Sequence, residues 1–170
     1  MASNVGFFAV SLSFLKPWMK RLLGQKGAHY LCMLMGVATY QPPHMTVLWE
    51  DQEYSGRTWK VLVGNVEWTL GGRLRIAPGA RTDDGELNVT IVPFKSKVNI
   101  LLKLPKISKG SLINERDILY FPVTRIDVNS DPPVGLEIDG DLIGTTPATF
   151  TVCPRAVQIV SPTPSNGETT

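Results

Sequence analysis

The chain is 170 residues long, with 43% hydrophobic residues, 19% charged residues and a formal net charge of +2. A chain of this length and composition can bury one sizeable core, so we expect a single folded domain. The small net charge, with no Lys/Arg run longer than Lys20-Arg21, argues against nucleic-acid binding and leaves a slight bias toward an anionic membrane surface.

The N-terminal part of the chain is apolar but predicts no membrane span. The run over residues 5–15 is too short, since a spanning helix needs about 20 residues. It also lacks the basic start and the cleavage site of a signal peptide, so we expect it to join the core. Apolar residues then recur at helical spacing, which predicts helices near 15–23 and 28–37. Pro17 suits the first turn of the first helix, and Gly24 suits its end.

After Gln41-Pro42-Pro43 the pattern changes to short apolar–polar alternation interrupted by glycine and proline, which predicts many short, mainly antiparallel strands. A third helix is predicted near 96–104, and Leu104-Pro105 is expected to end it. The small, polar residues 163–170 predict a disordered tail after one domain over residues 1–162. The strand-like runs are 59–61, 74–76, 87–91, 126–128 and 136–138.

The two cysteines, Cys32 and Cys153, lie far apart in segments that are otherwise apolar. This favours buried reduced thiols, with a single disulfide as the alternative. No CxxC spacing is present, and His29 and His44 have no neighbours of ligand type. The pattern therefore argues against a zinc or redox site, and we expect both histidines to be structural.

The most informative passage is residues 64–87, which read GNVEWTLGGRLRIAPGARTDDGEL. Its Asp83-Asp84-Gly85 corner is of a type where backbone carbonyls and a carboxylate converge on a hard cation such as Mg²⁺ or Ca²⁺. An ordinary turn is the alternative, because Asp readily hydrogen-bonds its own backbone and Gly supplies a positive φ. The local residues alone favour the turn.

The order of residues around this corner resembles the C-terminal domain of the bacterial diacylglycerol and lipid kinase family, relatives of the sphingosine kinases. That family typically shows N, G-G-G, P-x-A and D-D-G-x-L in this order. The segments 136–141 and 152–157 resemble the family's hydrophobic-Asp-Gly-Glu segment and its closing motif, so the likeness covers about residues 4–162, the second half of a full kinase. The residues that match the first motif are Asn65, Gly71-Gly72, Pro78, Ala80, Asp83-Asp84-Gly85 and Leu87.

The resemblance implies a mainly β fold, a two-layer antiparallel β-sandwich-like domain with a short N-terminal helical segment. It also implies a structural Mg²⁺, held by the backbone carbonyls of Arg81 and Glu86 and by the carboxylate of Asp84. Asp83 is expected to support that site through a hydrogen bond.

The resemblance further implies that Asp141 is the general base, which deprotonates a lipid hydroxyl as the hydroxyl attacks the γ-phosphate of ATP. The family has glutamate at this position. Aspartate shortens the arm by one methylene, about 1.5 Å, so we expect altered or absent activity. A plain hairpin turn over residues 139–141 is the alternative.

The family's nucleotide-binding half carries a GGDGT-type loop, and the chain contains neither this loop nor a GxGxxG or GxxxxGK[ST] motif. Phosphoryl transfer depends on positioning and charge neutralisation, so we expect no useful rate from this half alone. ATP is therefore expected as a cofactor only when a nucleotide-binding domain is supplied. Three explanations fit the missing nucleotide-binding half. The chain is a fragment, it works with a separate nucleotide-binding polypeptide or as a homo-oligomer, or it is a module that only binds.

The implied activity is ATP-dependent phosphorylation of diacylglycerol or a similar lipid alcohol, in a cytoplasmic protein peripheral to the inner face of the membrane. The alternative is a noncatalytic lipid-binding or PEGA-like interaction module, because residues 136–152 also resemble PEGA-type β modules. That alternative leaves residues 65–87 unexplained. Seven apolar residues offer surface for an acyl-chain cleft, although aromatics and methionines at helical spacing are more often core: Phe7, Phe8, Phe14, Trp18, Met19, Met33 and Met35.

Overall fold

The computed structural model of the protein describes residues 2–7, 10–11, 14–69, 74–108 and 111–156. Each of the five strand-like runs falls in or overlaps a strand. The elements in chain order are β1 (Ala2–Gly6), α2 (Pro17–Thr39), β2 (His44–Trp49), β3 (Gln52–Gly64), β4 (Trp68–Thr69), β5 (Leu74–Arg75), β6 (Leu87–Pro93), α3 (Lys97–Ser108), η1 (Leu112–Asn114), β7 (Leu119–Val123), β8 (Arg125–Asp131), β9 (Gly135–Ile138), β10 (Asp141–Thr145) and β11 (Ala148–Thr151).

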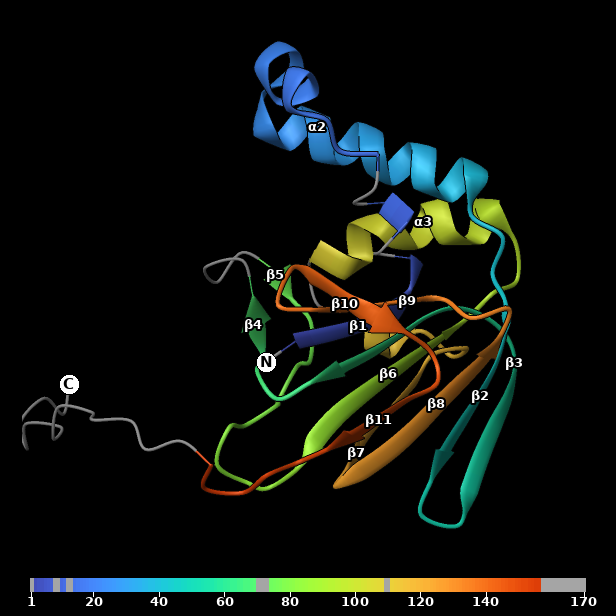
Figure 1. Cartoon of the computed structure of the whole chain (residues 1–170), viewed down its shortest axis with the longest axis vertical. Coiled ribbons are helices and arrows are strands. Elements are labelled where there is room, and N and C mark those ends of the chain that lie inside the picture. Colours follow the sequence, from blue (N-terminus) through green and yellow to red (C-terminus); the bar gives the residue numbers. More distant parts are fainter. Residues whose placement is uncertain (1, 8–9, 12–13, 70–73, 109–110, 157–170) are drawn as a thin grey trace, which may run out of the picture.

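Strand β3 connects the two layers of the fold. Its first half pairs with β2, which continues through β8 to β11. Its second half pairs with β6 on one edge and with β1 on the other, and these lead to β7 and to β9 and β10. All of these pairs are antiparallel, and helices α2 and α3 lie above the strands (Figure 1). The mainly β, sandwich-like prediction is confirmed.

The main core lies between the layers. Strand residues alternate in direction, so every second side chain of β3 and β6 points inward. Val61 and Val63 of β3 and Val89 and Ile91 of β6 are fully buried, and they join side chains from β2, β8 and β11 in one cluster. Full burial of such a side chain contributes about 1.5–3 kcal/mol, so this cluster is the main source of stability.

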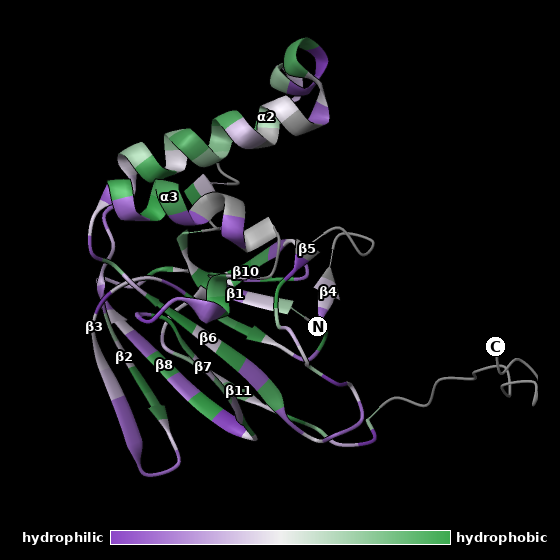
Figure 2. Cartoon of the chain, turned by 180° about the vertical axis from the view of Figure 1, so that it is seen from behind, coloured by the Kyte–Doolittle hydropathy of each residue, from purple (hydrophilic) through white to green (hydrophobic). Residues whose placement is uncertain are grey.

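A second apolar cluster fixes the helices on the sheet. Phe7, which follows β1, packs on Trp59 of β3 with ring centroids 4.6 Å apart and on Tyr40 with centroids 5.7 Å apart. Val37 of α2 and Ile100 of α3 complete the contact from the helical side. The helices therefore cover one face of the strands (Figure 2). The predicted burial of the N-terminal apolar run is confirmed at Phe7.

The helix predictions were correct in part. Helix α2 is interrupted at Gly24, where φ is 68° and ψ is 172°, as expected from the two predicted helices. Helix α3 was expected to stop at Leu104, but it continues through Pro105 to Ser108. Ile100 is buried before the proline, and Lys106 after it forms an ion pair with Glu115. Tertiary contacts on both sides thus outweigh the backbone hydrogen bond that proline removes.

The cysteines differ in environment. Both are free thiols, Cys32 buried and Cys153 exposed. The predicted burial of Cys153 is wrong, because it follows the end of β11 and comes directly after Val152, whose N–H donates to the Thr124 carbonyl at 3.0 Å. His44 is exposed on β2.

Among the described residues, no helix has the length and apolar character needed to span a bilayer.

Candidate functional site

The acidic corner predicted from the sequence forms a tight turn on the surface. The backbone N–H of Glu86 donates to Oδ1 of Asp84 at 3.0 Å, and Gly85 has a φ of 77°, a conformation that suits glycine. Arg81 donates to both carboxylate oxygens of Asp83 at 3.1 and 3.2 Å. This guanidinium lowers the pKa of the Asp83 carboxyl, chiefly through its hydrogen bond. The ordinary turn, which the sequence analysis gave as the alternative to a cation site, is therefore present.

The same corner fits the donor chemistry of the predicted Mg²⁺ site. Mg²⁺ takes oxygen ligands and usually keeps several waters beside one or two carboxylates. Oδ2 of Asp84 accepts none of the hydrogen bonds that the structure gives for described residues, and Asp84 and Glu86 are exposed. No group of three or more His, Cys, Asp or Glu side chains lies together in the described part of the chain. A cation here would therefore depend on backbone carbonyls, as predicted for Arg81 and Glu86.

The second predicted site residue, Asp141, is the first residue of β10 and is exposed. Asp139 and Gly140 form the β9–β10 turn, with φ values of 50° and 103°. Two consecutive positive φ values are typical of a two-residue hairpin turn. No hydrogen bond or ion pair holds the Asp141 carboxylate among the described residues, which leaves both oxygens accessible. The hairpin geometry is thus confirmed, and it presents Asp141 to solvent.

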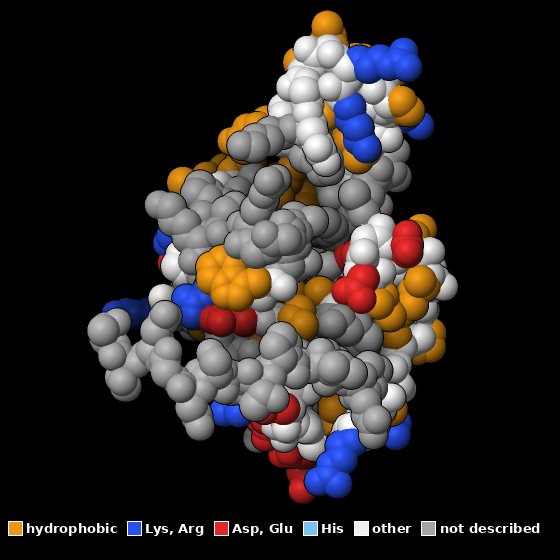
Figure 3. Space-filling view, turned by 90° about the vertical axis from the view of Figure 1, so that its left-hand side faces the viewer, with side chains coloured by type: hydrophobic (Ala, Val, Ile, Leu, Met, Phe, Trp, Pro, Cys, Tyr) orange, Lys and Arg blue, Asp and Glu red, His pale blue; other side chains and the backbone are white. Residues whose placement is uncertain are grey.

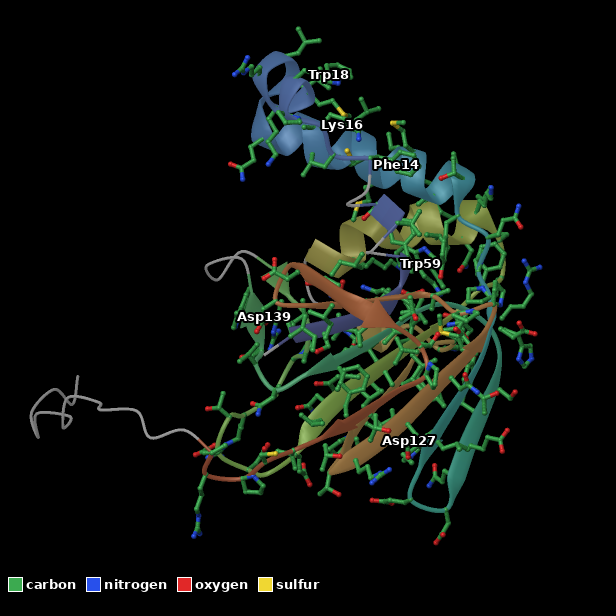
Figure 4. All side chains as sticks on the ribbon, viewed as in Figure 1. Phe14, Lys16, Trp18, Trp59, Asp127 and Asp139 are labelled. Atoms are coloured by element: carbon green, nitrogen blue, oxygen red, sulfur yellow. The ribbon has the colours of Figure 1, made fainter. Side chains whose placement is uncertain are left out.

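Asp139 fastens this turn to the start of the chain. Its carboxylate Oδ1 accepts the backbone N–H of Ala2 at 2.8 Å, and its own N–H donates to the Ala2 carbonyl at 2.9 Å. In Figure 4 the labelled Asp139 lies at the side of the molecule near β5 and β10. Asp139 therefore has a structural role that leaves the adjacent Asp141 free.

Sequence reasoning missed a buried carboxylate directly beneath the turn. Glu137 of β9 is 4% exposed, and its two oxygens accept hydrogen bonds from the Gly140 N–H and from the side-chain amide of Asn4. Lys60 of β3 is 3% exposed. Loss of hydration lowers its pKa to about 8, and the negative charge of Glu137 partly offsets this shift. The turn that carries Asp141 is thus anchored on a buried charged group.

The sequence pattern around these two charged residues indicates exposure and not burial. Lys60 stands between Trp59 and Val61, and Glu137 stands between Leu136 and Ile138. A lone charge inside an apolar strand is typical of a solvent-facing position on a half-exposed sheet. Here helices and loops cover that second face, so both charged residues are buried.

The loop between β4 and β6 is organised around Glu67. Its carboxylate Oε1 accepts from Arg75 Nε at 2.8 Å and from the Gly79 N–H at 3.2 Å, and Arg75 lowers its pKa. Tyr120 donates its hydroxyl to the Pro78 carbonyl at 2.8 Å. Asn65 places a buried Oδ1 here without a hydrogen-bond partner in the described part of the chain. Gly71-Gly72, also part of the motif, lies outside the described residues.

The two predicted site segments are separate. No hydrogen bond or ion pair joins residues 81–86 to residues 139–141 among the described residues. Residues 139–141 lie near β5, while residues 81–86 belong to the connection from β5 to β6 (Figure 1).

The seven residues considered for an acyl-chain cleft do not act as one group. Phe7 and Met19 are buried in separate clusters, and Phe14 and Met33 are half-buried. Trp18 and Met35 are exposed on α2, by 59% and 39%. Phe8 lies outside the described residues. The core interpretation therefore holds for Phe7 and Met19.

Comparison with known proteins gives consistent matches. The family described as "YegS C-terminal NAD kinase beta sandwich-like domain" matches residues 19–161. The chain is 24% identical to a Bacillus subtilis (strain 168) protein named diacylglycerol kinase, over 85% of this chain and 47% of that protein. It is 30% identical to a Staphylococcus aureus (strain Newman) protein provisionally named a lipid kinase, over 66% of this chain and 37% of that protein.

A solved structure gives the same fold. It comes from Bacillus anthracis str. Sterne, is provisionally described as a diacylglycerol kinase, and superposes with a TM-score of 0.65 at 21% identity. The superposition covers 90% of this chain and 49% of that chain. The chain thus spans less than half the length of the curated relatives it matches. The family match includes residues 65–87, which a PEGA-like module leaves unexplained.

Proposed function

The chain belongs to the YegS C-terminal NAD kinase beta sandwich-like domain family, and from this membership we propose that it is the C-terminal half of an ATP-dependent lipid kinase. The substrate is diacylglycerol or a similar lipid alcohol, and the protein is cytoplasmic and peripheral to the inner face of the membrane. The observation that carries the proposal is the exposed Asp141, presented by an anchored hairpin inside a family-matching sequence.

In this proposal Asp141 acts as the general base. The lipid hydroxyl gives its proton to the Asp141 carboxylate, and the hydroxyl oxygen forms a bond to the γ-phosphorus of ATP. The bond to the bridging oxygen breaks, and ADP leaves with the electron pair. The accessible carboxylate of Asp141 suits this role, because a base must come within hydrogen-bond reach of the proton it removes.

The remaining parts have supporting roles. The carbonyls of Arg81 and Glu86 and the carboxylate of Asp84 would hold Mg²⁺, which supplies positive charge that braces the acidic loop. A separate nucleotide-binding domain supplies ATP, and this half alone is inactive, because transfer needs the phosphates held in line with the attacking oxygen.

The test of the catalytic role uses a fusion with the part of the Bacillus subtilis relative that this chain does not cover, and the readout is phosphate transfer from ATP to diacylglycerol in mixed micelles. We expect Asp141→Asn to lower kcat by about 100-fold or more, because general-base catalysis typically contributes 10²–10⁴. Asp51→Asn, which changes an exposed aspartate in the β2–β3 turn, is the matched control and leaves the rate unchanged. An unchanged rate in Asp141→Asn removes Asp141 from the mechanism.

A noncatalytic lipid-binding module is the second candidate. It is favoured by one observation, the aspartate at position 141 where the family has the longer glutamate. In that case the fusion binds diacylglycerol vesicles without transferring phosphate, and Asp141→Glu does not restore transfer.

The metal assignment predicts a Mg²⁺-dependent gain in melting temperature. At a Mg²⁺ concentration about ten times Kd, binding stabilises by about 1.4 kcal/mol, which raises Tm by about 3–5 °C for a chain of this size. We expect Asp84→Ala to abolish the difference in Tm between EDTA and Mg²⁺, measured by calorimetry. Asp51→Ala, at an exposed aspartate in the β2–β3 turn, keeps it. An equal Mg²⁺ effect in Asp84→Ala rules out the carboxylate ligand.

A further inference from the structure

A small cavity lies between β3, β6 and the loop that follows β5. Its volume is about 20 Å³, which is enough for one water-sized group or for one or two oxygen atoms of a larger ligand. Its polar lining consists of Lys60 of β3, Arg75 of β5 and Thr90 of β6, and apolar side chains such as Ile76 and Ile113 form the rest. All three polar side chains can donate hydrogen bonds, and two of them are cationic.

The strand register brings two of these donors to one face of the sheet. β3 and β6 pair antiparallel, with Leu62 directly opposite Thr90. Lys60 is two residues from Leu62 on the same strand, so its side chain points to the same face as that of Thr90. The two positions are diagonal neighbours across the pair, a separation that a long side chain can bridge.

Both buried donors lack an acceptor. Thr90 is 2% exposed, and its Oγ1 has no hydrogen-bond partner in the described part of the chain. Lys60 is 3% exposed, and no hydrogen bond or ion pair of its ammonium group occurs among the described residues. Glu137 acts on this ammonium through its charge without pairing with it there. Buried donors of this kind are costly to leave unsatisfied, so an acceptor that enters the cavity gains from both.

Arg75 lies where the cavity reaches the surface. Its side chain is 38% exposed. Nε and Nη2 donate to Oε1 of Glu67, which orients the guanidinium, and Nη1 donates to no group among the described residues. The side of the molecule that carries β4 and β5 in Figure 1 faces the viewer in Figure 3, where basic, acidic and hydrophobic side chains lie next to one another. A guanidinium with a free nitrogen is well suited to phosphate oxygens.

We propose that Lys60, Thr90 and Arg75 form a binding site for a phosphate group, supplied by inorganic phosphate or by a phosphate monoester. One phosphate oxygen enters the cavity and accepts from the Lys60 ammonium and the Thr90 hydroxyl, while another remains at the opening beside Arg75. A tetrahedral phosphate has oxygens for both ends, and the small volume admits it only end-on. A water molecule can accept from the same donors, but an anion also offsets the buried charge and forms stronger hydrogen bonds.

The test is isothermal titration calorimetry of the full chain at pH 7 and constant ionic strength, without ATP. Lys60 is protonated there, because its pKa is about 8. We expect inorganic phosphate to bind and dihexanoyl phosphatidic acid to bind more tightly, since the half-buried Ile76 and Ile113 at the cavity can contact the acyl chains. Equal affinities identify free phosphate as the ligand of the site. Dihexanoyl phosphatidylcholine, whose phosphate is a diester next to a cation, is not expected to bind.

Two variants test the donors. Lys60→Met is expected to weaken phosphate binding by about tenfold or more, and Thr90→Val by about fivefold, the losses typical of a charged and a neutral hydrogen bond. Thr90→Val keeps the branched shape and removes a hydroxyl without a partner, so Tm without phosphate does not fall and weaker binding is not a folding defect. Arg116→Met and Thr124→Val, at exposed positions that do not line the cavity, bind phosphate like the unmodified protein.

Methyl NMR locates the ligand. Phosphate is expected to shift the signals of Ile76, Thr90 and Ile113, while those of Leu48 on β2 stay unchanged. The inference does not rest on the proposed function, and Asp141→Asn is expected to bind phosphate normally, so failure of the catalytic proposal is distinct from failure of this site. Two results overturn the inference: no phosphate binding, which leaves a cavity for water only, or unchanged affinity in folded Lys60→Met and Thr90→Val.

Discussion

Replacement of Glu137 by alanine is expected to lower the free energy of unfolding by about 2–4 kcal/mol, because two buried donors lose their acceptor and the buried Lys60 loses an opposing charge. Near neutral pH Lys60 is protonated, because its pKa is about 8. Without Glu137 this ammonium stays buried with no opposing carboxylate, and the Gly140 N–H and the Asn4 amide lose their acceptor. The measurement is urea unfolding at pH 7, followed by circular dichroism.

A conservative substitution of Glu137 separates the contribution of its hydrogen bonds to stability from that of its charge. Glu137→Gln keeps an acceptor for the Gly140 N–H, and the Asn4 amide can turn to accept from the new NH₂ group, so the loss is smaller. Combining Glu137→Ala with Lys60→Met removes both charges and is expected to recover part of the stability. Asp141→Ala, at the exposed carboxylate four residues away, stays within about 0.5 kcal/mol. A loss below about 1 kcal/mol in Glu137→Ala contradicts the anchoring role.

Stability is expected to increase with pH above neutrality, which is unusual for a protein and follows from Lys60. The ordinary pKa of lysine is 10.5, and burial lowers that of Lys60 to about 8. Between these values the unfolded chain binds more protons than the folded chain, so the free energy of unfolding rises with pH. The rise from pH 7 to pH 10 amounts to about 2–3 kcal/mol. The stabilisation is lost as the pH falls through 8.

A second buried group limits this rise. Burial raises the pKa of Tyr40 far above its ordinary value of 10.0. Above about pH 10 the folded chain keeps a phenolic proton that the unfolded chain releases, so stability falls again. We therefore expect maximal stability near pH 10, measured by urea midpoints at unit pH steps. Lys60→Met is expected to flatten the curve between pH 8 and 10; an unaltered slope in that variant would assign the effect to another group.

The sequence predicted more of the turns than of the buried polar contacts. Asp84-Gly85 and Asp139-Gly140 were read as turns because Asp and Gly favour these backbone conformations within a few residues. The exposure of Asp141 follows from its place at the end of the hairpin. Glu137 was missed, since its importance depends on strands β1 and β3 and on the cover above them.

The helices show the same contrast between local features, which the sequence predicted, and tertiary contacts, which it did not. The break at Gly24 was predictable from local chain chemistry, whereas the passage of α3 through Pro105 depends on contacts with residues far along the chain, such as Glu115. The exposure of Trp18 was equally undetermined. Its spacing suits a core residue, and only the packing of Met19 shows which face of the segment is already occupied.

Motif order, alternation and turn chemistry are local properties, so the family, the antiparallel β class and the positions of the two acidic turns could be predicted from the sequence. The tertiary structure alone decided that Lys60 and Glu137 are buried within electrostatic reach of each other and that α2 presents apolar and basic residues to solvent. Those outcomes depend on strand register across β1 and on the cover supplied by distant elements. Burial, unlike periodicity, is a property of the assembled layers.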